Sequence, residues 1–507
     1  MTNQVDATIL HLLEHGAHSD DAIVAPDGPA VTYGSLRSQI SDLASQLREN
    51  GIGQGDRVAI VLPNSIEAII CFLAVASVGA AAPLNPAYKV DEFRFYLEDT
   101  DAQALITSSE VGEEARRVAS SSILQIDASM NSDGQVKLSP SGGSRKWRST
   151  EDTKLDDVAL VLHTSGTTSQ PKRVPLTHRN LTISAQNIAG TYRLSPDDIS
   201  LCIMPLFHVH GIVASTLSTL FTGGTVIVPP RFNALNFWDV VREHRVTWFS
   251  AVPSMHQALL NRARRREGVR IGYDGLRFIR SCSAALSSST MLEMEERVGV
   301  PMLEAYGMTE AAHQMTSNPL PPGVRFPGTV GKGTGVKIGI MNKDGTLQEV
   351  GTQGEVVIQG PNVIQGYEDN PEANDASFTN GWFRTGDQGF LDGEGVLTLS
   401  GRIKELINRS GEKISPIEID DVLLMHSAVS ESVAFGVPHS THGEVPSAAV
   451  VVNSRVSEKE LISHCREHLS DFKCPRTIHI VDAIPRTATG KVQRRIVAAA
   501  ILGVPLV

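Results

Sequence analysis

The chain has 507 residues, of which 41% are hydrophobic and 20% are charged, and this composition is ordinary for a globular protein. A single hydrophobic core does not grow to this length, so the sequence predicts two or more domains. The formal net charge is −11, from 45 basic and 56 acidic residues, which argues against a general binder of nucleic acid or of membrane surfaces. An anionic ligand would therefore need a local group of basic side chains.

Five cysteines are scattered along the chain without paired or CxxC spacing: Cys71, Cys202, Cys282, Cys465 and Cys474. This pattern predicts neither a disulfide framework nor a zinc site, and such thiols suit a reducing cytoplasm. The N-terminus lacks the basic segment and apolar run of a signal peptide. Residues 68–84 form the longest uncharged apolar stretch, but it is shorter than the ~20 residues of a membrane span and contains Pro83. We therefore expect a cytoplasmic protein with no membrane span.

The N-terminal part of the chain alternates between helical and strand patterns. Residues 32–50 carry leucine and isoleucine at helical spacing and predict a helix. Residues 57–63 predict a strand, the chain from Ser65 onward predicts a helix, and residues 104–107 predict another strand. This alternation predicts a doubly wound α/β fold. Residues 129–153 are polar and rich in serine and glycine, so we expect a surface excursion there.

A run of small hydroxyl residues follows the predicted buried strand at 158–163. It consists of Thr164, Ser165, Gly166, Thr167, Thr168 and Ser169, and it leads to Pro171 and Lys172. Small residues let backbone N–H groups approach an anion, hydroxyls add donors and the lysine supplies a full charge. We interpret the run as a phosphate clamp, with a solvated loop as the alternative. The Walker A spacing is absent, and Val492 stands where the TGK of residues 489–491 would need Ser or Thr.

Several strands predicted further along the chain end in polar loops. The strands are expected at residues 200–205, 225–229, 246–251, 276–280 and 303–306. The residues that follow them include PLFHVHG, SCSAALSSS and GMTEAAHQM, which carry His, Ser, Thr and Glu. Ligands of open α/β sheets bind at the carboxyl ends of the strands, so we expect these loops to converge on one cleft.

The sequence pattern changes in the last third of the chain. Residues 330–400 alternate between short strands and glycines, which predicts a small β subdomain. Gly401 marks a break, and a compact α/β segment of ~100 residues follows. We therefore predict an N-terminal domain at 1–401 and a separate C-terminal domain at 402–507. The basic pair 494–495 is interpreted as a solvated helix face rather than a contact to phosphates.

Six stretches resemble the AMP-forming acyl-activating enzymes, a superfamily of acyl- and aryl-CoA ligases, peptide-synthetase adenylation domains and beetle luciferase. They are TSGTTSQPK (164–172), EAYGMTE (304–310), GEVVIQGPNVIQGY (354–367), WFRTGD (382–387), GRIKELINRSGEKISPIEIDDVL (401–423) and PRTATGK (485–491). They occur in the order of that superfamily and cover nearly the whole chain. The resemblance implies a large α/β adenylation domain followed by a small, mobile α/β C-terminal domain.

The resemblance also implies a two-step reaction of a carboxylic acid with ATP and CoA. The carboxylate would attack the α-phosphorus of MgATP, giving an acyl-adenylate and pyrophosphate, and the thiol of CoA would then displace AMP. A carboxylate is a poor electrophile because its charge is delocalised, and a phosphate ester leaving group removes this obstacle. The protein would mainly neutralise charge and position the reactants.

The resemblance assigns catalytic roles to residues in four of these regions. The clamp loop would hold the β- and γ-phosphates, Thr309 would hydrogen-bond the α-phosphate, and Glu310 would bind Mg²⁺, which prefers carboxylate oxygen. Lys491 would bridge the substrate carboxylate and phosphate oxygens during adenylation. His208 matches a histidine common to the superfamily, and we include it among the catalytic residues. The structural alternatives are a helix N-terminal charge for Glu310 and a solvated surface lysine for Lys491.

Further residues would bind the nucleoside and CoA or act as a hinge. Tyr306 would lie against the adenine, and Asp387 would accept from the ribose hydroxyls with Arg402 nearby. Lys404 occupies the hinge position about which the small domain would turn between the half-reactions. The turn would bring three residues to the thiol tunnel: Ser410, Gly411 and Glu412. The structural alternatives are a β-turn carboxylate for Asp387, core packing for Tyr306 and an exposed pair for Arg402 and Lys404.

Polar residues in the strand-end loops predict a small acid pocket. Relatives that take fatty or aryl acids need a roomy apolar pocket, whereas this chain offers four polar side chains: His210, Ser281, Ser283 and His313. Imidazoles and hydroxyls can donate hydrogen bonds to an anion, so a short acid with a second carboxylate would suit them. The segments PLFHVHG, FIRSCSA and MTEAAHQM, together with Ser169, resemble the oxalate–CoA ligase branch of plants and fungi. By that resemblance His210, Ser283 and His313 would grip the distal carboxylate of oxalate, and satisfied residues around the cleft are the alternative.

Other functions stay open at this point. Malonate or another small or medium acid is the second ligase hypothesis. A carrier-loading adenylation domain fits less well, because neither the SCSAAL nor the TEAAH segment has an acidic residue placed to hold an amino group. A catalytically silent nucleotide-binding or scaffold protein is a hypothesis of another class, against which Lys491, Glu310 and the clamp argue. A luciferase-type oxygenation is disfavoured by the small polar pocket, and the oligomeric state is not indicated.

Overall fold

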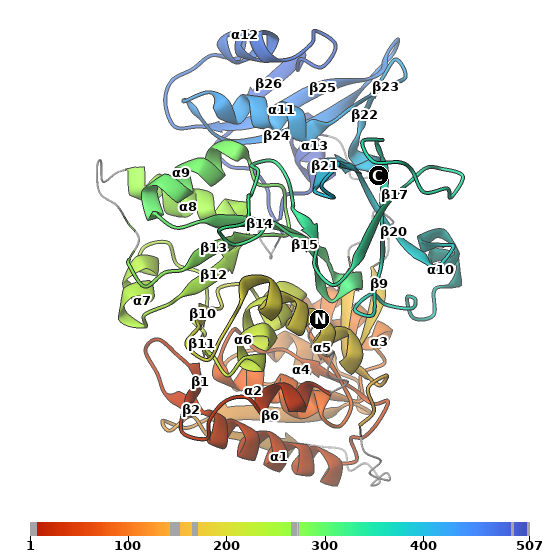
Figure 1. Cartoon of the computed structure of the whole chain (residues 1–507). Helices are drawn as coiled ribbons and strands as arrows, with labels where there is room; N and C mark the ends of the chain where they lie inside the picture. The colour runs from red at the N-terminus through yellow and green to blue at the C-terminus, as the bar shows by residue number, and fades with distance from the viewer. Residues whose placement is uncertain are drawn as a thin grey trace.

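The computed structural model describes residues 8–141, 153–164, 171–264, 271, 273–487 and 491–503. These residues form two large sheets, a small β unit at one side and a C-terminal unit that covers one end of the molecule (Figure 1). The predicted α/β class and the order of a large N-terminal part and a small C-terminal part are confirmed.

The first sheet has seven strands in the described residues, in the order β7-β6-β5-β3-β4-β8-β9. They are β3 (Arg57–Ile60), β4 (Ala80–Pro83), β5 (Ala104–Thr107), β6 (Leu124–Met130), β7 (Val136–Ser141), β8 (Val158–Thr164) and β9 (Lys172–Thr177). The inner strands are parallel, and β7 and β9 pair antiparallel at the edges. Its helices are α1 (Tyr33–Glu49), α2 (Ile66–Ala76), α3 (Val90–Asp99) and α4 (Glu113–Val118). This is the doubly wound pattern that the sequence predicts.

Helix α1 shows why the N-terminal prediction holds. The side chain of Thr32 accepts a hydrogen bond from the backbone N–H of Ser35 and so caps the first turn. The leucine and isoleucine side chains at helical spacing all lie in the core: Leu36, Ile40, Leu43 and Leu47. The helix therefore buries one face and leaves the other in solvent.

The second sheet has nine strands in the described residues, in the order β16-β15-β14-β13-β12-β10-β11-β1-β2. They are β1 (Asp21–Val24), β2 (Ala30–Thr32), β10 (Ile199–Leu201), β11 (Thr225–Ile227), β12 (Trp248–Ala251), β13 (Phe278–Ser281), β14 (Met302–Met308), β15 (His313–Ser317) and β16 (Lys332–Gly333). Its helical segments are η1 (Ile9–Leu13), α5 (His178–Tyr192), the π-helix η2 (His210–Leu217), α6 (Ser218–Phe221), α7 (Phe237–Glu243), α8 (Pro253–Arg264), α9 (Ser288–Val298) and the 3₁₀-helix η3 (Thr309–Ala311). The five strands predicted here all form.

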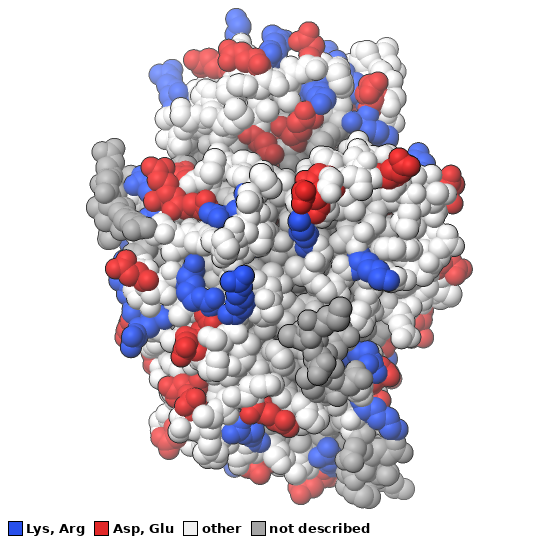
Figure 2. All heavy atoms as spheres, in the orientation of Figure 1, with Lys and Arg blue, Asp and Glu red and all other residues white. Residues whose placement is uncertain are grey.

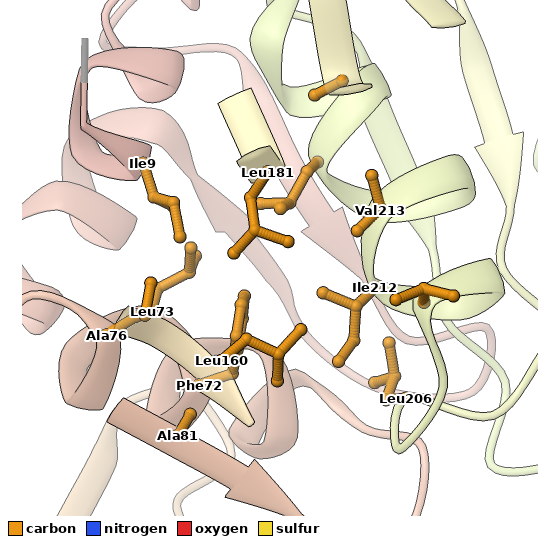
Figure 3. Close-up of a cluster of buried hydrophobic side chains, with 14 of the residues drawn as sticks. Ile9, Phe72, Leu73, Ala76, Ala81, Leu160, Leu181, Leu206, Ile212 and Val213 are labelled. Atoms are coloured by element: carbon orange, nitrogen blue, oxygen red, sulfur yellow. The ribbon is translucent and has the colours of Figure 1, made fainter. Parts of the chain in front are cut away.

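One apolar core joins the two large sheets. Phe72 of α2 and Leu160 of β8 lie opposite Leu181 of α5 and Ile212 and Val213 of η2 (Figure 3). Burial of each such side chain stabilises the fold by roughly 1.5–3 kcal/mol. The polar loops at the ends of both sheets are therefore held in a fixed relation to each other.

The prediction for residues 129–153 needs a correction. We expected only a surface excursion, but residues 136–141 form β7 and pair with β6. Val136 and Leu138 alternate inward in this strand, and two inward side chains are enough to seat an edge strand on the core. Residues 142–152 of that prediction lie outside the described residues.

The small β unit and the C-terminal unit follow the second sheet. The β unit contains β17 (Lys337–Met341), β18 (Gly354–Gln359), α10 (Pro371–Ser377), β19 (Phe378–Thr379), β20 (Trp382–Leu391) and β21 (Leu397–Arg402). The C-terminal unit contains η4 (Ile403–Glu405), β22 (Ile407–Arg409), β23 (Glu412–Ile414), α11 (Pro416–Met425), β24 (Val429–His439), β25 (Gly443–Val452), α12 (Glu458–His468), β26 (Thr477–Ile480) and α13 (Arg494–Leu502). The predicted boundary at 401/402 falls within the last two residues of β21, so the chain leaves the β unit at that point.

All five cysteines are buried, and none of them forms a disulfide. No helix in the described part of the chain is both long and apolar enough to cross a bilayer. On the face shown in Figure 2, acidic and basic side chains are interspersed.

Arg494 departs from its interpretation as a solvated residue. It donates to the Asp420 carboxylate at 2.6 Å and to the Ala434 carbonyl at 2.8 Å, and it lies 3.5 Å from Glu405. Burial raises the pKa of Asp420, and the guanidinium opposes this shift. Arg494 therefore ties α13 to α11 and β24, whereas the next residue, Arg495, is exposed.

We predict that Arg494→Ala lowers the free energy of unfolding by about 2–4 kcal/mol, because it leaves the Asp420 carboxylate buried without its cation. The measurement is urea unfolding of the full chain. Arg495→Ala is the matched control and should unfold like the parent protein. Equal unfolding midpoints for the two variants would show that the ion pair does not stabilise the C-terminal unit.

Glu304 of β14 holds the loop that follows β13. Its carboxyl group accepts from the backbone N–H of Leu286 at 2.9 Å, and the side chain is only 5% exposed. Burial raises the pKa of Glu304 to about 8. The group is therefore protonated in the folded protein at neutral pH, whereas it is ionised in the unfolded chain.

This shift predicts that Glu304 makes stability fall as pH rises. Between pH 4.5, the ordinary Glu pKa, and pH 8 the folded state binds one more proton than the unfolded state, so its contribution is lost as pH passes through the folded pKa. The slope would be at most about 1.4 kcal/mol per pH unit. Glu304→Gln should flatten the pH dependence of the melting temperature between these limits, and Glu296→Gln on the exposed side of α9 should not. Parallel curves for both variants and the parent would contradict the assignment.

Candidate active site

The clamp region begins where β8 and β9 pair. Thr164 lies opposite Lys172 in this antiparallel pair, at the ends of the two strands. The ammonium of Lys172 lies over the ring of Tyr367, 4.5 Å from its centroid. Burial lowers the pKa of Lys172, while the charge of Glu310 raises it and that of Lys404 lowers it. Five residues of the predicted clamp run lie outside the described residues: Ser165, Gly166, Thr167, Thr168 and Ser169.

Glu310 stands in η3, directly after β14, and is almost fully buried with Thr309. The hydroxyl of Tyr367 donates to Glu310 Oε1 at 2.8 Å, and the backbone N–H of Ile364 donates to the Glu310 carbonyl at 2.9 Å. The first bond orients the carboxylate and the second fixes the backbone that carries it, and among the described residues Tyr367 uses only one carboxylate oxygen. Sequence reasoning missed Tyr367, although it is the last residue of the quoted segment GEVVIQGPNVIQGY.

Asp387 joins the β unit to the second sheet. The hydroxyl of Tyr306 donates to Asp387 Oδ2, and the guanidinium of Arg402 lies 3.0 Å from Asp387 Oδ1. Burial raises the pKa of Asp387, and Arg402 opposes this shift. The predicted residues Tyr306, Asp387 and Arg402 are thus one connected group, at the point where the chain passes into the C-terminal unit.

Lys491 comes from the C-terminal unit and reaches the end of the second sheet. Its ammonium nitrogen lies 3.4 Å from His208 Nε2. The backbone N–H of His210 donates to His208 Nδ1 at 3.1 Å, so the neutral His208 ring carries its proton on Nε2. Two donors therefore converge on one point, and an anionic oxygen between them would accept from both.

Burial sets the protonation chemistry of this pair. It lowers the pKa of Lys491, which the charge of Arg402 also lowers and those of Glu310 and Asp387 raise. It lowers the pKa of His208 well below its usual value, with Lys491 adding to the shift. Burial therefore favours the neutral imidazole of His208, and it makes an anionic partner favourable for the Lys491 ammonium.

The loop that carries His208 is positioned by the first sheet. Asn64, which follows β3, donates to the Met204 carbonyl and accepts from the Leu206 N–H, both at 2.9 Å. A Cβ at Gly211 would lie 2.3 Å from the Pro205 carbonyl, so only glycine allows the chain to turn so closely into η2. A π-helix of this kind is uncommon and recurs at functional sites.

His210, Ser283 and His313 come together as predicted for the acid pocket. His210 Nδ1 lies 3.0 Å from Ser283 Oγ, and the two histidine rings meet edge to face at 4.9 Å. Neither ring nitrogen of His313 has a hydrogen-bond partner among the described residues, and His313 is 2% exposed. A buried imidazole without partners is costly, so the arrangement favours a ligand there. A Cβ at Gly307 would lie 2.1 Å from the His313 carbonyl, so glycine is required for this approach.

Ser281 does not join this group. Side chains alternate across a strand, and Ser281 shares its face of β13 with Ile279, which packs into the separate core formed with Met302 and Ala251. Ser283, two residues later, lies beyond the strand end and has a φ of +74°, which turns its side chain to His210. Ser281 Oγ is buried and has no hydrogen-bond partner among the described residues, and its role in substrate binding stays a prediction.

The residues predicted to reach the CoA thiol lie apart from the group around His210. Ser410 and Gly411 form a two-residue turn between β22 and β23, with φ of 54° and 94°, and Glu412 begins β23. The Ser410 hydroxyl lies 2.9 Å from His442 Nδ1, within the same C-terminal unit, and the turn is exposed. This domain orientation therefore brings Lys491 to the centre and not the turn.

Taken together, the geometry provides a row of basic and acidic groups suited to a phosphorylated ligand and a carboxylate. Lys172 and Glu310 lie at one end. Lys491 and His208 lie next to the group of His210, Ser283 and His313, here called the His210 pocket. Cations and N–H donors of this kind stabilise the charge that develops in nucleotidyl transfer.

Comparisons with known proteins identify the family and its relatives over nearly the whole chain. The AMP-binding enzyme family matches residues 14–368, and the AMP-binding enzyme C-terminal domain matches residues 418–491. The chain is 47% identical to an oxalate–CoA ligase of Arabidopsis thaliana, with 94% of each chain covered. It is 42% identical to an oxalate–CoA ligase of Saccharomyces cerevisiae, again with 94% of each chain covered.

The fold is also similar to a solved structure with bound nucleotide. This is o-succinylbenzoate coenzyme A synthetase from Bacillus subtilis in complex with ATP and a magnesium ion, with a TM-score of 0.83 and 30% identity over 97% of this chain and 99% of that one. The resemblance carried by the six sequence motifs is confirmed, and the chain belongs to the AMP-binding enzyme family.

Proposed function

We propose that this protein is an AMP-forming oxalate–CoA ligase. One carboxylate of oxalate attacks the α-phosphorus of ATP, which gives oxalyl-adenylate and releases pyrophosphate. The CoA thiol then attacks the oxalyl carbonyl carbon, which gives oxalyl-CoA and releases AMP. Two oxalate–CoA ligases at 42% and 47% identity over nearly the whole chain support this assignment.

The observation that carries the proposal is the convergence of Lys491 and His208 beside the His210 pocket. The ammonium and the imidazole N–H would both donate to the attacking carboxylate and the α-phosphate oxygens. The distal carboxylate would then contact Ser283 and His313, and both of these residues lie against His210. A two-carbon diacid is short enough to lie between the Lys491–His208 pair and the group of Ser283 and His313. A long or aromatic acid would instead place apolar atoms against imidazoles.

The residues around the predicted phosphate site fit a magnesium ion. Glu310 offers one carboxylate oxygen that Tyr367 does not occupy, and such an oxygen is the ligand that Mg²⁺ prefers. When bound, the ion would neutralise the charge of the phosphates. Thr309 would donate to the α-phosphate, Lys172 would hold the leaving pyrophosphate, and Asp387 would accept from the ribose.

The second half-reaction requires another domain orientation. The C-terminal unit would turn about Lys404, withdraw Lys491 and bring the exposed turn at Ser410 to Glu412 to the CoA thiol. The five unpaired cysteines suit a reducing cytoplasm, where ATP and CoA are available. Malonate is the alternative substrate, and a panel of acids in an assay of pyrophosphate release tests the two against each other.

We predict that Lys491→Ala lowers the rate of adenylation by about 10²–10³-fold, because one charged donor to the transition state is lost. The measurement is oxalate-dependent exchange of labelled pyrophosphate into ATP. Lys459→Ala, an exposed lysine of the same unit, is the matched control. Exchange by the Lys491 variant at the rate of the control would remove the lysine from the mechanism.

We predict that His210→Ala or His313→Ala raises the KM for oxalate about 10- to 100-fold and leaves the KM for ATP nearly unchanged. A hydrogen bond to a charged group contributes about 1.5–3 kcal/mol. His313 would donate to the distal carboxylate, and His210 would orient the Ser283 hydroxyl that donates to it. Steady-state kinetics with each substrate varied in turn measures both constants, and the exposed His468→Ala serves as control. Unchanged oxalate kinetics in both variants would reject the pocket assignment.

A further inference from the structure

A fully buried arginine lies behind the acid pocket. Arg280 of β13 has no exposed surface, and in the described part of the chain its hydrogen-bond partners are all neutral. Its Nε donates to Tyr192 Oη at 2.8 Å, Nη2 donates to Gln314 Oε1 at 3.0 Å, and Nη1 donates to Ser250 Oγ at 2.8 Å. A buried charge without a counter-charge is costly, so a structure that keeps one favours an anion nearby.

The contacts of Arg280 fix the direction of a chain of hydrogen bonds. A guanidinium can only donate, and Nη1 also lies 3.5 Å from His210 Nε2. Ser250 Oγ accepts from Arg280 and is 2.6 Å from the same His210 nitrogen. Because Nε2 faces donors, it is the accepting nitrogen of the ring, and the Ser250 hydroxyl donates to it.

Because Nε2 accepts, only Nδ1 can carry the ring proton of a neutral His210. Burial lowers the pKa of His210 well below its usual value, and the charge of Arg280 adds to this, so the ring is neutral and carries a single proton. With Nε2 accepting, the proton lies on Nδ1, which donates to Ser283 Oγ at 3.0 Å. Ser283 already accepts from His210, so its own hydroxyl proton remains for a ligand in the pocket.

We propose that Arg280 is a positioning residue for the second negative group of the acid substrate, acting through Ser250 and His210 on the Ser283 hydroxyl. This inference rests on the proposed function, because it takes the acid to be a small dianion. The positive charge that favours the distal carboxylate is then that of Arg280 and not of a histidine. A site with donors fixed in this way rejects acids that lack a second acceptor, because its polar groups would stay unpaired.

Ser250→Ala tests the link while Arg280 stays in place. We expect the KM for oxalate to rise about tenfold, with kcat and the KM for ATP changed less than about twofold, and with the inhibition constant of acetate unchanged, because acetate has no second acceptor. Ser200→Ala removes another fully buried hydroxyl, on the neighbouring strand β10, and should behave like the parent. A parent-like KM for oxalate in Ser250→Ala would overturn the proposal.

A double-mutant cycle separates the relay from general damage to the pocket. Ser250→Ala should add little in an Arg280→Met background, because both changes interrupt the same path from Arg280 through Ser250 to His210. Equal effects of Ser250→Ala with and without Arg280 would overturn the relay. Melting temperatures of all variants show whether each one is folded.

The tautomer of His210 gives a test that needs no substrate. In the ¹⁵N-histidine-labelled full-length protein, signals absent from His210→Gln belong to His210, and we expect Nδ1 protonated and Nε2 unprotonated. The double variant Ser250→Ala/Arg280→Met removes both donors that face Nε2 and should introduce protonation there. Protonation of Nε2 in the parent protein would overturn the relay. If the parent instead releases pyrophosphate with another acid and not with oxalate, the proposed function fails while the tautomer still decides the relay.

Discussion

The proposed chemistry of this protein depends on the approach of Lys491 to His208, two residues 283 positions apart in the chain. Placing an ammonium against a neutral imidazole N–H is unfavourable by itself, since both groups donate and burial lowers the pKa of the lysine. An anion between them reverses this balance. The contact exists only because the C-terminal unit lies over the carboxyl end of the second sheet (Figure 1), so the domain arrangement and the chemistry are one constraint.

Neutral partners hold several charged groups of the proposed site in place. The two carboxylates expected to face ATP each accept from a tyrosine hydroxyl, Glu310 from Tyr367 and Asp387 from Tyr306, and Asp387 is also paired with Arg402. Arg280 is likewise held by hydroxyl and amide oxygens. Neutral partners orient a charge without cancelling it, so it remains available to a substrate, and a low local dielectric strengthens its effect.

Much of the fold could be predicted because local pattern and long-range packing agree. α1 has both the apolar spacing and the capping threonine, and the strands of both sheets are short apolar runs. β7 was missed because its two inward residues are too few to form a clear alternating pattern. Arg494 was misjudged because a basic helix face and a buried ion pair look alike until Asp420 is brought to it.

The sequence by itself determined the family, since six segments in a fixed order carry it, and it identified most of the polar residues of the proposed site. Only the tertiary structure decided which of two nearby serines contacts His210, because the positive φ of Ser283 and the alternation of β13 set their directions. It also decided that Arg280 has neutral partners. Partners from β12, α5 and β15 meet this side chain only after the sheet forms, and hydrogen-bond direction follows from three-dimensional contacts that no local pattern records.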